Sequence, residues 1–384
     1  MNSSAFNILD ACASPFARLE AQSSCTRLVA LSLMRRVLTN IRRAAGGRFN
    51  ELAFATIEKT VNTSPLNWRP EIGIAAAAVG RGDPELAALQ IALAYDDIES
   101  YEVPVSTAGC VYLDGSIIRV SGKSALERND GFLKLSSSEG AQEFISASGM
   151  WVEQRSIPGD DWRIQGLGFS RPRYCIASGH KASSGIFPSV LRNKTVTSPS
   201  MSSVDTGGSE RVAEIENALA LLCDSNAYSG WLSGVVDGIL VTPSGTSPGS
   251  SSPEFPGLIA VGRDDLGVLR RLEQLVGAAC QQYLFQLSLV YALIDAGREE
   301  VAYVHSRRSY TTVRRALAAA HEHVNIILLM NEIEKSCDNP GAARVRAERR
   351  RVMLMSECNH VLSGSAVLTD EGRYLWDRLI ASIE

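Results

Sequence analysis

The sequence predicts an α+β fold with a helical N-terminal part, a strand-rich middle, and a helical C-terminal part that contains two long buried helices. Three observations support this prediction. Apolar residues recur at helical spacing near both ends of the chain. Short runs rich in β-branched and aromatic residues, separated by turn residues, fill the middle. The stretch 275–294 carries no formal charge, which is typical of a buried helix.

These patterns divide the chain into four regions. Residues 1–100 form a helical region, with one long helix expected over 15–45, and residues 101–190 form a strand-rich region. Residues 191–209 are rich in Ser, Thr and Gly, which predicts a linker or surface loop. Residues 210–384 form a second helical region, and this is where we expect the functional site.

Individual elements follow from the same patterns. We expect short strands at 101–104, 110–113 and 116–120, because β-prone residues there are separated by turn residues. We expect long helices at 266–293 and 312–334. The segment LTDEGRYLWDRLIAS predicts a capped amphipathic helix near residue 375.

Composition argues against nucleic-acid binding and membrane insertion. The formal net charge is −4, so no strongly basic face is expected. The arginine-rich run 344–351 reads as the solvated face of a helix. The uncharged stretch 275–294 holds Gln281, Gln282 and Gln286, whose amides are costly in lipid, so we expect a buried helix there and not a membrane span.

The eight cysteines are scattered without a CxxC pair, so neither a disulfide framework nor a cysteine zinc site is predicted. The N-terminus has no basic start followed by an apolar core, so we expect no signal peptide and a cytoplasmic location.

Several segments together resemble one protein family. They are FARLEAQSSCTRLVALSLMRRVL, YEVPV, WVEQR, AEIENALALL before a tryptophan, and SPGSSSPEFPGLIAVGRDD before a long helix. In this order they resemble the HExxH-motif peptide-modification proteins, which include peptide β-hydroxylases that use iron and 2-oxoglutarate. The resemblance implies a peptide or an amino-acid-derived intermediate as substrate, free or bound to a carrier.

The metal motif that the resemblance implies is absent from this chain. The matching stretch begins at Gly277 and Ala278, where the family has His and Glu, and Gln281 stands where the family has its second His. Gly and Ala have no ligating atom, and a neutral amide is a poor ligand for iron or zinc. We therefore expect no metal and no cofactor at this position, and extra space beside Gly277.

The downstream segment keeps residues of the implied kinds. Arg308 matches an arginine that usually follows tryptophan in the family, and its planar fork, like that of Arg307, suits a carboxylate. His323 matches the family's downstream histidine. His321 and His323 project about 200° apart on a helix, so they cannot share one metal ion. We expect one of them to be partly buried and the other to lie near the rim of the apolar surface.

Other polar residues of the long helix leave alternatives open. Gln281 and Gln282 either bind a substrate amide or belong to a polar network of the core. Cys280 reads as a small buried hydrophobe rather than a nucleophile.

Three functions follow. The first is a metal-independent tailoring enzyme of natural-product biosynthesis that modifies a peptide or an amino-acid-derived intermediate. The second is a pseudoenzyme that binds a peptide or a partner enzyme, and the third is a non-haem metalloenzyme with rearranged ligands. The candidate residues are His305, His321 and His323 for acid–base catalysis, and Arg307, Arg308, Gln281 and Gln282 for substrate binding.

Overall fold

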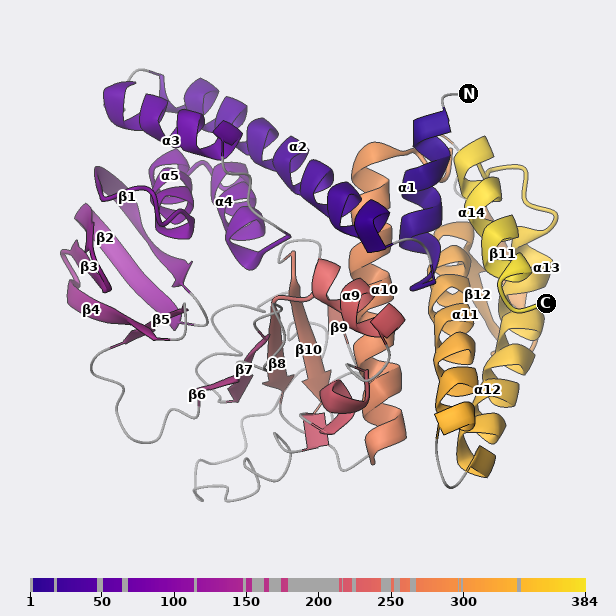
Figure 1. The fold of residues 1–384 in the computed structure, drawn as a ribbon. Coiled ribbons are helices and arrows are strands. Elements are labelled where there is room, and N and C mark those ends of the chain that lie inside the picture. The colour runs from indigo at the N-terminus through magenta and orange to yellow at the C-terminus, as the bar shows by residue number, and fades with distance from the viewer. Residues whose placement is uncertain are drawn as a thin grey trace. The chain divides into compact units, whose positions relative to one another are not determined.

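A computed structural model places the chain in two compact units, which are described separately (Figure 1). Unit 1 comprises Met1–Thr26, Ala213–Gly234 and Asp265–Glu384, and unit 2 comprises Arg27–Val212 and Val235–Asp264. The structure describes residues 3–16, 19–46, 51–63, 68–113, 116–147, 150–153, 162–165, 174–178, 214–215, 217–222, 226–242, 250–251, 256–262, 267–295, 297, 300–336 and 340–384. The predicted linker 191–209 lies outside these residues.

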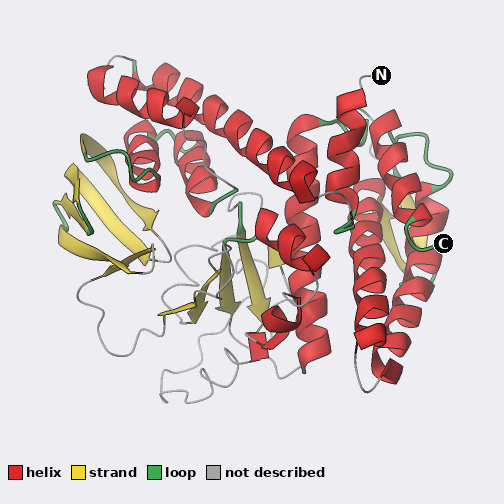
Figure 2. Ribbon diagram, viewed as in Figure 1, coloured by secondary structure: helices red, strands yellow, loops and turns green. Residues whose placement is uncertain are grey.

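The fold is α+β, as the sequence predicts: helices occupy both ends of the chain, and the strands lie mainly in its middle (Figure 2). The N-terminal helices are α1 (Ser3–Ala13), α2 (Leu19–Ala45), α3 (Glu51–Thr63), α4 (Pro70–Gly80) and α5 (Pro84–Ala94). Both α4 and α5 begin with a proline, whose fixed φ suits the first helical position.

Unit 2 contains a five-stranded antiparallel sheet in simple sequential order. Its strands are β1 (Ser100–Leu113), β2 (Ser116–Asn129), β3 (Phe132–Ser137), β4 (Gly140–Ala147) and β5 (Met150–Glu153). The two strands predicted at 101–104 and 110–113 are one long strand, β1, with a shift of register between Val105 and Gly109. An irregularity of this kind lets one strand continue through a polar stretch that the sequence presents as a turn.

Helix α5 packs on β1 through a buried amide clamp. Gln90 Nε2 donates to the carbonyl of Tyr112 over 2.9 Å, and its Oε1 accepts from the Tyr112 N–H over 2.7 Å. The clamp satisfies both polar ends of a side chain that is fully buried.

A second sheet of unit 2 is mixed. It has the order β6 (Trp162–Gln165), β7 (Tyr174–Ser178), β8 (Gly238–Thr242), β10 (Leu258–Gly262) and β9 (Ser250–Ser251). Strands β7, β8 and β10 are mutually parallel, and β6 and β9 pair antiparallel at the two edges. Gly257 precedes β10 with φ +76°, and an added Cβ would lie 2.6 Å from the Trp68 carbonyl, so glycine is required there.

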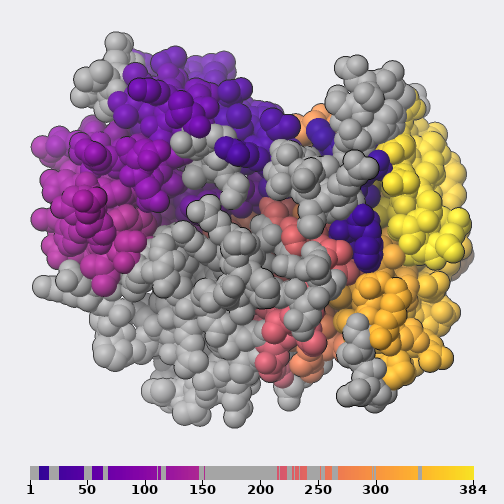
Figure 3. All heavy atoms as spheres, viewed as in Figure 1, coloured from indigo at the N-terminus to yellow at the C-terminus, as the bar shows by residue number. Residues whose placement is uncertain are grey.

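Unit 1 is built around the two long helices that the sequence predicts. They are α10 (Val268–Val290) and α11 (Val313–Ser336), which pack against each other. Around them lie α9 (Asn226–Val235), α12 (Pro340–Met353), the π-helix η1 (Leu354–Asn359), α13 (His360–Leu362) and α14 (Asp370–Ala381). The atoms of the last helices form one continuous surface, orange to yellow in Figure 3.

A short antiparallel hairpin connects the two long helices. Strand β11 (Val301–Val304) pairs with β12 (Ser309–Thr312), and residues 305–308 form its turn. Helix α11 follows directly after β12, so the hairpin lies at the N-terminal end of that helix.

In the described part of the chain, no helix combines the length and the apolar character that crossing a bilayer would require. Helix α10 contains residues 275–290 of the uncharged stretch and ends four residues before its end, and Gln274, Gln282 and Gln286 are buried on it.

Candidate functional site

The degenerate motif lies on the buried face of α10. Gly277, Ala278, Ala279 and Cys280 are all buried, and Gln281 is partly exposed. This face packs against α11, the helix that carries His321 and His323. The structure therefore brings the motif position and the two histidines into one helix pair of unit 1.

The space beside Gly277 is taken by a carboxylate. A Cβ added at Gly277 would lie 3.2 Å from Cδ and 3.3 Å from Cγ of Glu322. The expected extra space is therefore filled by a side chain of α11 that lies between the two histidines in the sequence.

Helix α12 supplies the counter-charge for this carboxylate. Arg350 Nη1 donates to Glu322 Oε1 over 3.2 Å, and Arg350 Nη2 donates to Glu273 Oε2 of α10 over 2.9 Å. Arg346, one turn earlier on α12, donates to Glu273 Oε1 over 3.1 Å. These four residues form a network, called here the α10–α12 ion network, that joins three helices.

The network corrects the prediction that the arginine run 344–351 is simply a solvated face. The side chain of Arg350 is 17% exposed and that of Arg346 is 31% exposed, whereas Arg344 is 69% exposed. Arg346 and Arg350 are four residues apart, so they share a helix face that packs towards α10 and α11. That spacing was the one signal in the sequence that could have singled them out.

His323 extends the network as a neutral imidazole. Its Nδ1 lies 3.2 Å from Arg350 Nη1, and a guanidinium can only donate, so Nδ1 accepts and the proton sits on Nε2. Nε2 is buried and has no hydrogen-bond partner among the described residues. Burial, together with the charges of Arg350 and Arg307, lowers the pKa of His323 to about 3.

Glu322 has the opposite tendency. Burial raises the pKa of its carboxyl above the usual value, although Arg350 acts to lower it. The network therefore holds a carboxyl group that gains protons readily beside a histidine that gains them reluctantly.

His321 points to a different set of partners. Its Nε2 lies 2.9 Å from the carbonyl oxygen of Cys12 on α1, and its ring lies 6.4 Å from that of Trp231 on α9. Burial lowers the pKa of His321 to about 4. The two histidines thus face apart, as their spacing predicts, but both are buried, whereas one was expected near the rim.

Cys280 is a buried donor rather than an exposed thiol. Its Sγ lies 3.6 Å from the carbonyl oxygen of His321, and burial raises its pKa well above the usual value. Gln282 is buried beside it on α10, and both Gln281 and Gln282 have interaction partners. Gln286, one turn further on, is fully buried, and neither end of its amide has a partner in the described part of the chain.

The other predicted residues lie in the hairpin turn between β11 and β12. His305, Arg307 and Arg308 are all exposed. Arg307 Nη2 lies 2.5 Å from Glu357 Oε2 on η1, so this arginine is directed towards the helical core. Arg308, the expected counterpart of the family's arginine, has no ion pair among the described residues and adopts φ +49°.

Among the described residues, no group of three or more His, Cys, Asp and Glu side chains is arranged to hold a metal ion. Glu322, the side chain that faces Gly277, is paired with Arg350.

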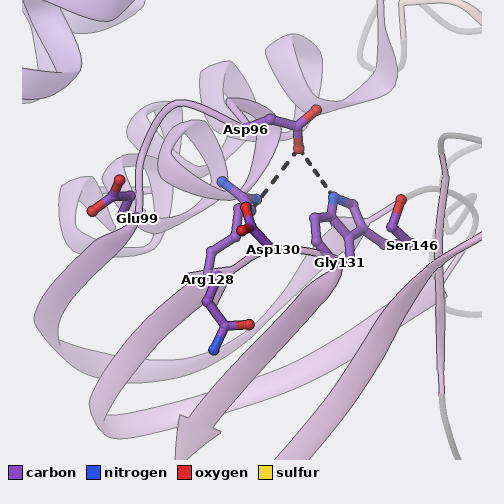
Figure 4. Close-up of a pocket in the computed structure, with 8 residues that line it drawn as sticks. Asp96, Glu99, Arg128, Asp130, Gly131 and Ser146 are labelled. Carbon is purple, nitrogen blue, oxygen red and sulfur yellow. Dashed lines mark hydrogen bonds and ion pairs between the residues drawn. The ribbon is translucent and has the colours of Figure 1, made fainter.

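Unit 2 contains a separate pocket of about 570 Å³ (Figure 4). Its lining includes the acidic residues Asp96, Glu99 and Asp130 together with Arg128 and Trp151. Asp96 contacts both Arg128 and Trp151. Its Oδ1 accepts from Trp151 Nε1 over 3.1 Å and lies 3.9 Å from Arg128 Nε (Figure 4).

Arg128 mainly stabilises the backbone beside this pocket. Its guanidinium donates to the carbonyls of Leu93 and Ile98, each over 3.0 Å, and to that of Tyr95. These carbonyls lie at and just after the C-terminal end of α5, where backbone acceptors lack helical partners. The guanidinium also lies 5.4 Å from the centre of the Trp151 ring. Arg128 therefore anchors α5 to the sheet, and the acidic residues form an exposed rim around it.

Comparisons with known proteins add no identity to these sites. No protein-family model matches this chain, and no curated protein matches it. The resemblance to the HExxH-motif proteins therefore stays a prediction from the sequence.

Proposed function

We propose that this protein is a non-catalytic binding protein for a peptide or a partner protein, in which the catalytic metal position of an HExxH-type ancestor has become an ion network. The observation that carries the proposal is the carboxylate of Glu322, which fills the space beside Gly277 and is held there by Arg350. A side chain that is packed and paired in this way links helices, and it leaves no open coordination position.

The arrangement of the predicted catalytic histidines supports this reading. His321 contacts the backbone of α1, His323 contacts Arg350, and His305 lies exposed in the hairpin turn. With pKa values of about 4 and about 3, the two buried histidines are neutral near pH 7 and are poor general acids.

A metal-independent tailoring enzyme is the second candidate, and one observation favours it. Glu322, whose pKa is raised, and His323, whose pKa is lowered, belong to the same network. Groups whose environments move their pKa values apart are typical of acid–base pairs in active sites. The substrate class, a peptide or an amino-acid-derived intermediate, comes from the resemblance alone.

Binding and turnover can be measured in one experiment. The purified protein is dialysed against a pool of peptides with free C-terminal carboxylates and against the same peptides with amidated C-termini. Retention and mass are then read by mass spectrometry, with and without iron(II), 2-oxoglutarate and ascorbate. We expect selective retention of some peptides with no change of mass.

Two results would decide against the proposal. Absence of any selective retention would remove the binding function. A mass change that requires the protein and disappears in Glu322→Gln would instead support the tailoring enzyme. Arg349→Met, at an exposed position on α12, serves as the matched control for effects of substitution near the network.

A further inference from the structure

One face of the β11–β12 hairpin exposes aromatic and aliphatic side chains. Strand alternation places Val301, Tyr303 and Tyr310 on the same face, called here the tyrosine face, and their exposed fractions are 52%, 38% and 71%. The two tyrosines are direct cross-strand partners whose ring centres lie 5.2 Å apart in an edge-to-face arrangement. On the opposite face, Val304 is buried, so the hairpin is fixed to unit 1 by one side only.

Three arginines lie in the hairpin turn and directly after β12. Arg308, Arg314 and Arg315, called here the arginine rim, are exposed and have no ion pair within the described residues. Two acidic residues that the structure describes beside the hairpin are engaged elsewhere: Glu357 pairs with Arg307, and Glu300 accepts from Ser365. No described residue forms an ion pair with the rim, so its charge is not neutralised within the part of the chain that the structure describes.

Two of these arginines lie at positions where they do not stabilise helix α11. Arg314 and Arg315 are in the first turn of α11, next to Thr312, whose Oγ1 accepts from the N–H of Arg315 over 3.2 Å. The N-terminal end of a helix is already positive, so arginines are unfavourable there. Helix stability therefore does not account for their position.

The turn itself holds a strained arginine. Arg308 has φ +49°, a conformation that glycine adopts readily and that branched or long side chains rarely adopt. Strain of this kind tends to be kept where the side chain has a task. Here the strained residue belongs to the arginine rim.

The backbone of β12 offers an open edge. The N–H of Val313 donates to the carbonyl of Glu300, so the pair Tyr303–Tyr310 is of the type whose backbone groups point outward. On β11, the outward carbonyl of Tyr303 lies 3.3 Å from His360 Nε2. On β12, no described residue hydrogen-bonds to the outward groups of Tyr310.

We propose that the hairpin binds an extended acidic segment of a peptide or partner protein, which adds as a strand to the edge of β12. The partner's alternate side chains would lie on the tyrosine face, and its carboxylates would pair with the arginine rim. Tyrosine and arginine are the residue types enriched at the energetic centres of protein interfaces. This inference rests on the proposed binding function and names its surface and the chemistry of its partner.

The test uses defined peptides and fluorescence anisotropy. The probe is a fluorescein-labelled octapeptide of alternating glutamate and valine. One comparison peptide replaces glutamate by lysine, and the other replaces valine by proline, which cannot donate to a strand ladder. We expect the glutamate–valine peptide to bind with an affinity that falls as salt rises, and each comparison peptide to bind at least tenfold more weakly.

Variants locate the binding surface. The double variant Arg314→Glu/Arg315→Glu and the single variant Tyr310→Ser should each weaken binding at least tenfold, whereas the control Arg349→Glu on α12 should not. Glutamates in the first turn of a helix favour its dipole, so the double variant should keep or raise the melting temperature. Its loss of binding therefore cannot result from unfolding.

Several outcomes would overturn the inference. The first is that the probe does not bind at concentrations up to about 1 mM, which is on the order of the dissociation constant of a very weak complex. Others are equal weakening by Arg349→Glu, or tighter binding of a ten-nucleotide oligothymidine than of the peptide, which would indicate a nucleic-acid surface. Failure of the proposed function is distinguishable from these results, because it would appear in the peptide pool as absence of any selective retention or as a change of substrate mass, whatever the affinity of the hairpin for the probe.

Discussion

Replacement of Arg350 by Met should destabilise unit 1 through the α10–α12 ion network. Arg350 contacts Glu273, Glu322 and His323 at 2.9–3.2 Å. Methionine keeps most of the aliphatic packing but leaves Glu322 without its cation, whereas Glu273 still contacts Arg346. Loss of one partner costs about 3–5 kcal/mol for a fully buried pair and about 0–1 kcal/mol for an exposed one.

The burial of this network lies between those limits. The side chains of Arg350, Glu273 and Glu322 are 17%, 10% and 30% exposed. We therefore expect a loss of about 2–3 kcal/mol in the free energy of unfolding, limited by protonation of Glu322. For a domain of about 150–250 residues this corresponds to a fall of about 4–12 °C in melting temperature.

Urea unfolding and calorimetry of the wild-type protein, Arg350→Met and Arg349→Met measure this effect. The control replaces an exposed arginine that has no ion pair among the described residues, so it should stay within about 0.5 kcal/mol of wild type. The pKa of His323, followed by NMR, should also rise in Arg350→Met, because the arginine charge lowers it. Equal stability of the two variants, with no change in that pKa, would refute the network as a stabilising element.

Four further predictions follow from the structure of unit 1. Gly277→His should be less stable than Gly277→Ala in urea, because an added Cβ requires only a small shift of the carboxylate that faces this position, whereas an imidazole must displace it; equal stability would mean that the carboxylate moves freely. The pKa values of His321 and His323 are lowered from 6.5 to about 4 and about 3. The free energy of unfolding should therefore have its full value above about pH 6.5 and fall by up to about 1.4 kcal/mol per pH unit per histidine as the pH approaches those pKa values. Urea unfolding between pH 7.5 and 5 should show this slope, and His323→Gln should reduce it. A slope that the substitution leaves unchanged would contradict the lowered pKa of His323. Cys280 should resist iodoacetamide in the folded protein and react after denaturation, as peptide mapping by mass spectrometry can show; rapid labelling of the folded protein would indicate an accessible thiolate. Thr369→Ala should cost about 1 kcal/mol by removing the N-cap of α14, and Thr369→Ser should not; matching losses would show that the cap contributes little.

The long helices were the most predictable part of the fold. The sequence places them at 266–293 and 312–334, and the structure has α10 at Val268–Val290 and α11 at Val313–Ser336. Apolar periodicity over more than five turns leaves little ambiguity about the type of element. Their ends differ by a few residues because helix ends depend on capping contacts that periodicity does not contain.

The strand region was less predictable because local polarity and tertiary packing disagree. Exposed Ser106 and Thr107 suggested a break, but β1 continues through them. Gly109 also suggested a turn, but an added Cβ there would lie 2.4 Å from Leu86 Cδ2 on α5. The glycine allows the helix to approach the strand closely, which the sequence alone presents as a turn signal.

The sequence located the candidate site but did not show which side chain occupies the space beside Gly277. The missing ligands at Gly277 and Gln281 are readable, and so is the divergence of His321 and His323. The side chain that occupies the space, Glu322, comes from another helix, and no local pattern connects the two. Which arginines of a charged run turn inward is likewise decided by helix packing rather than by composition.

Helix α1 depends on contacts with residues that follow it at great distance along the chain. The carbonyl of Cys12 meets His321 across 309 residues, and Asp10 pairs with Arg378 across 368 residues. At synthesis rates of about 5–20 residues per second, α1 leaves the ribosome about 15–60 s before the helix that carries His321. During that time its apolar residues Leu9, Ala11 and Cys12, all buried in the folded protein, have none of these partners. A high expression level should therefore favour aggregation unless a chaperone binds this segment. Slower translation would not shorten the time that α1 spends without its partners.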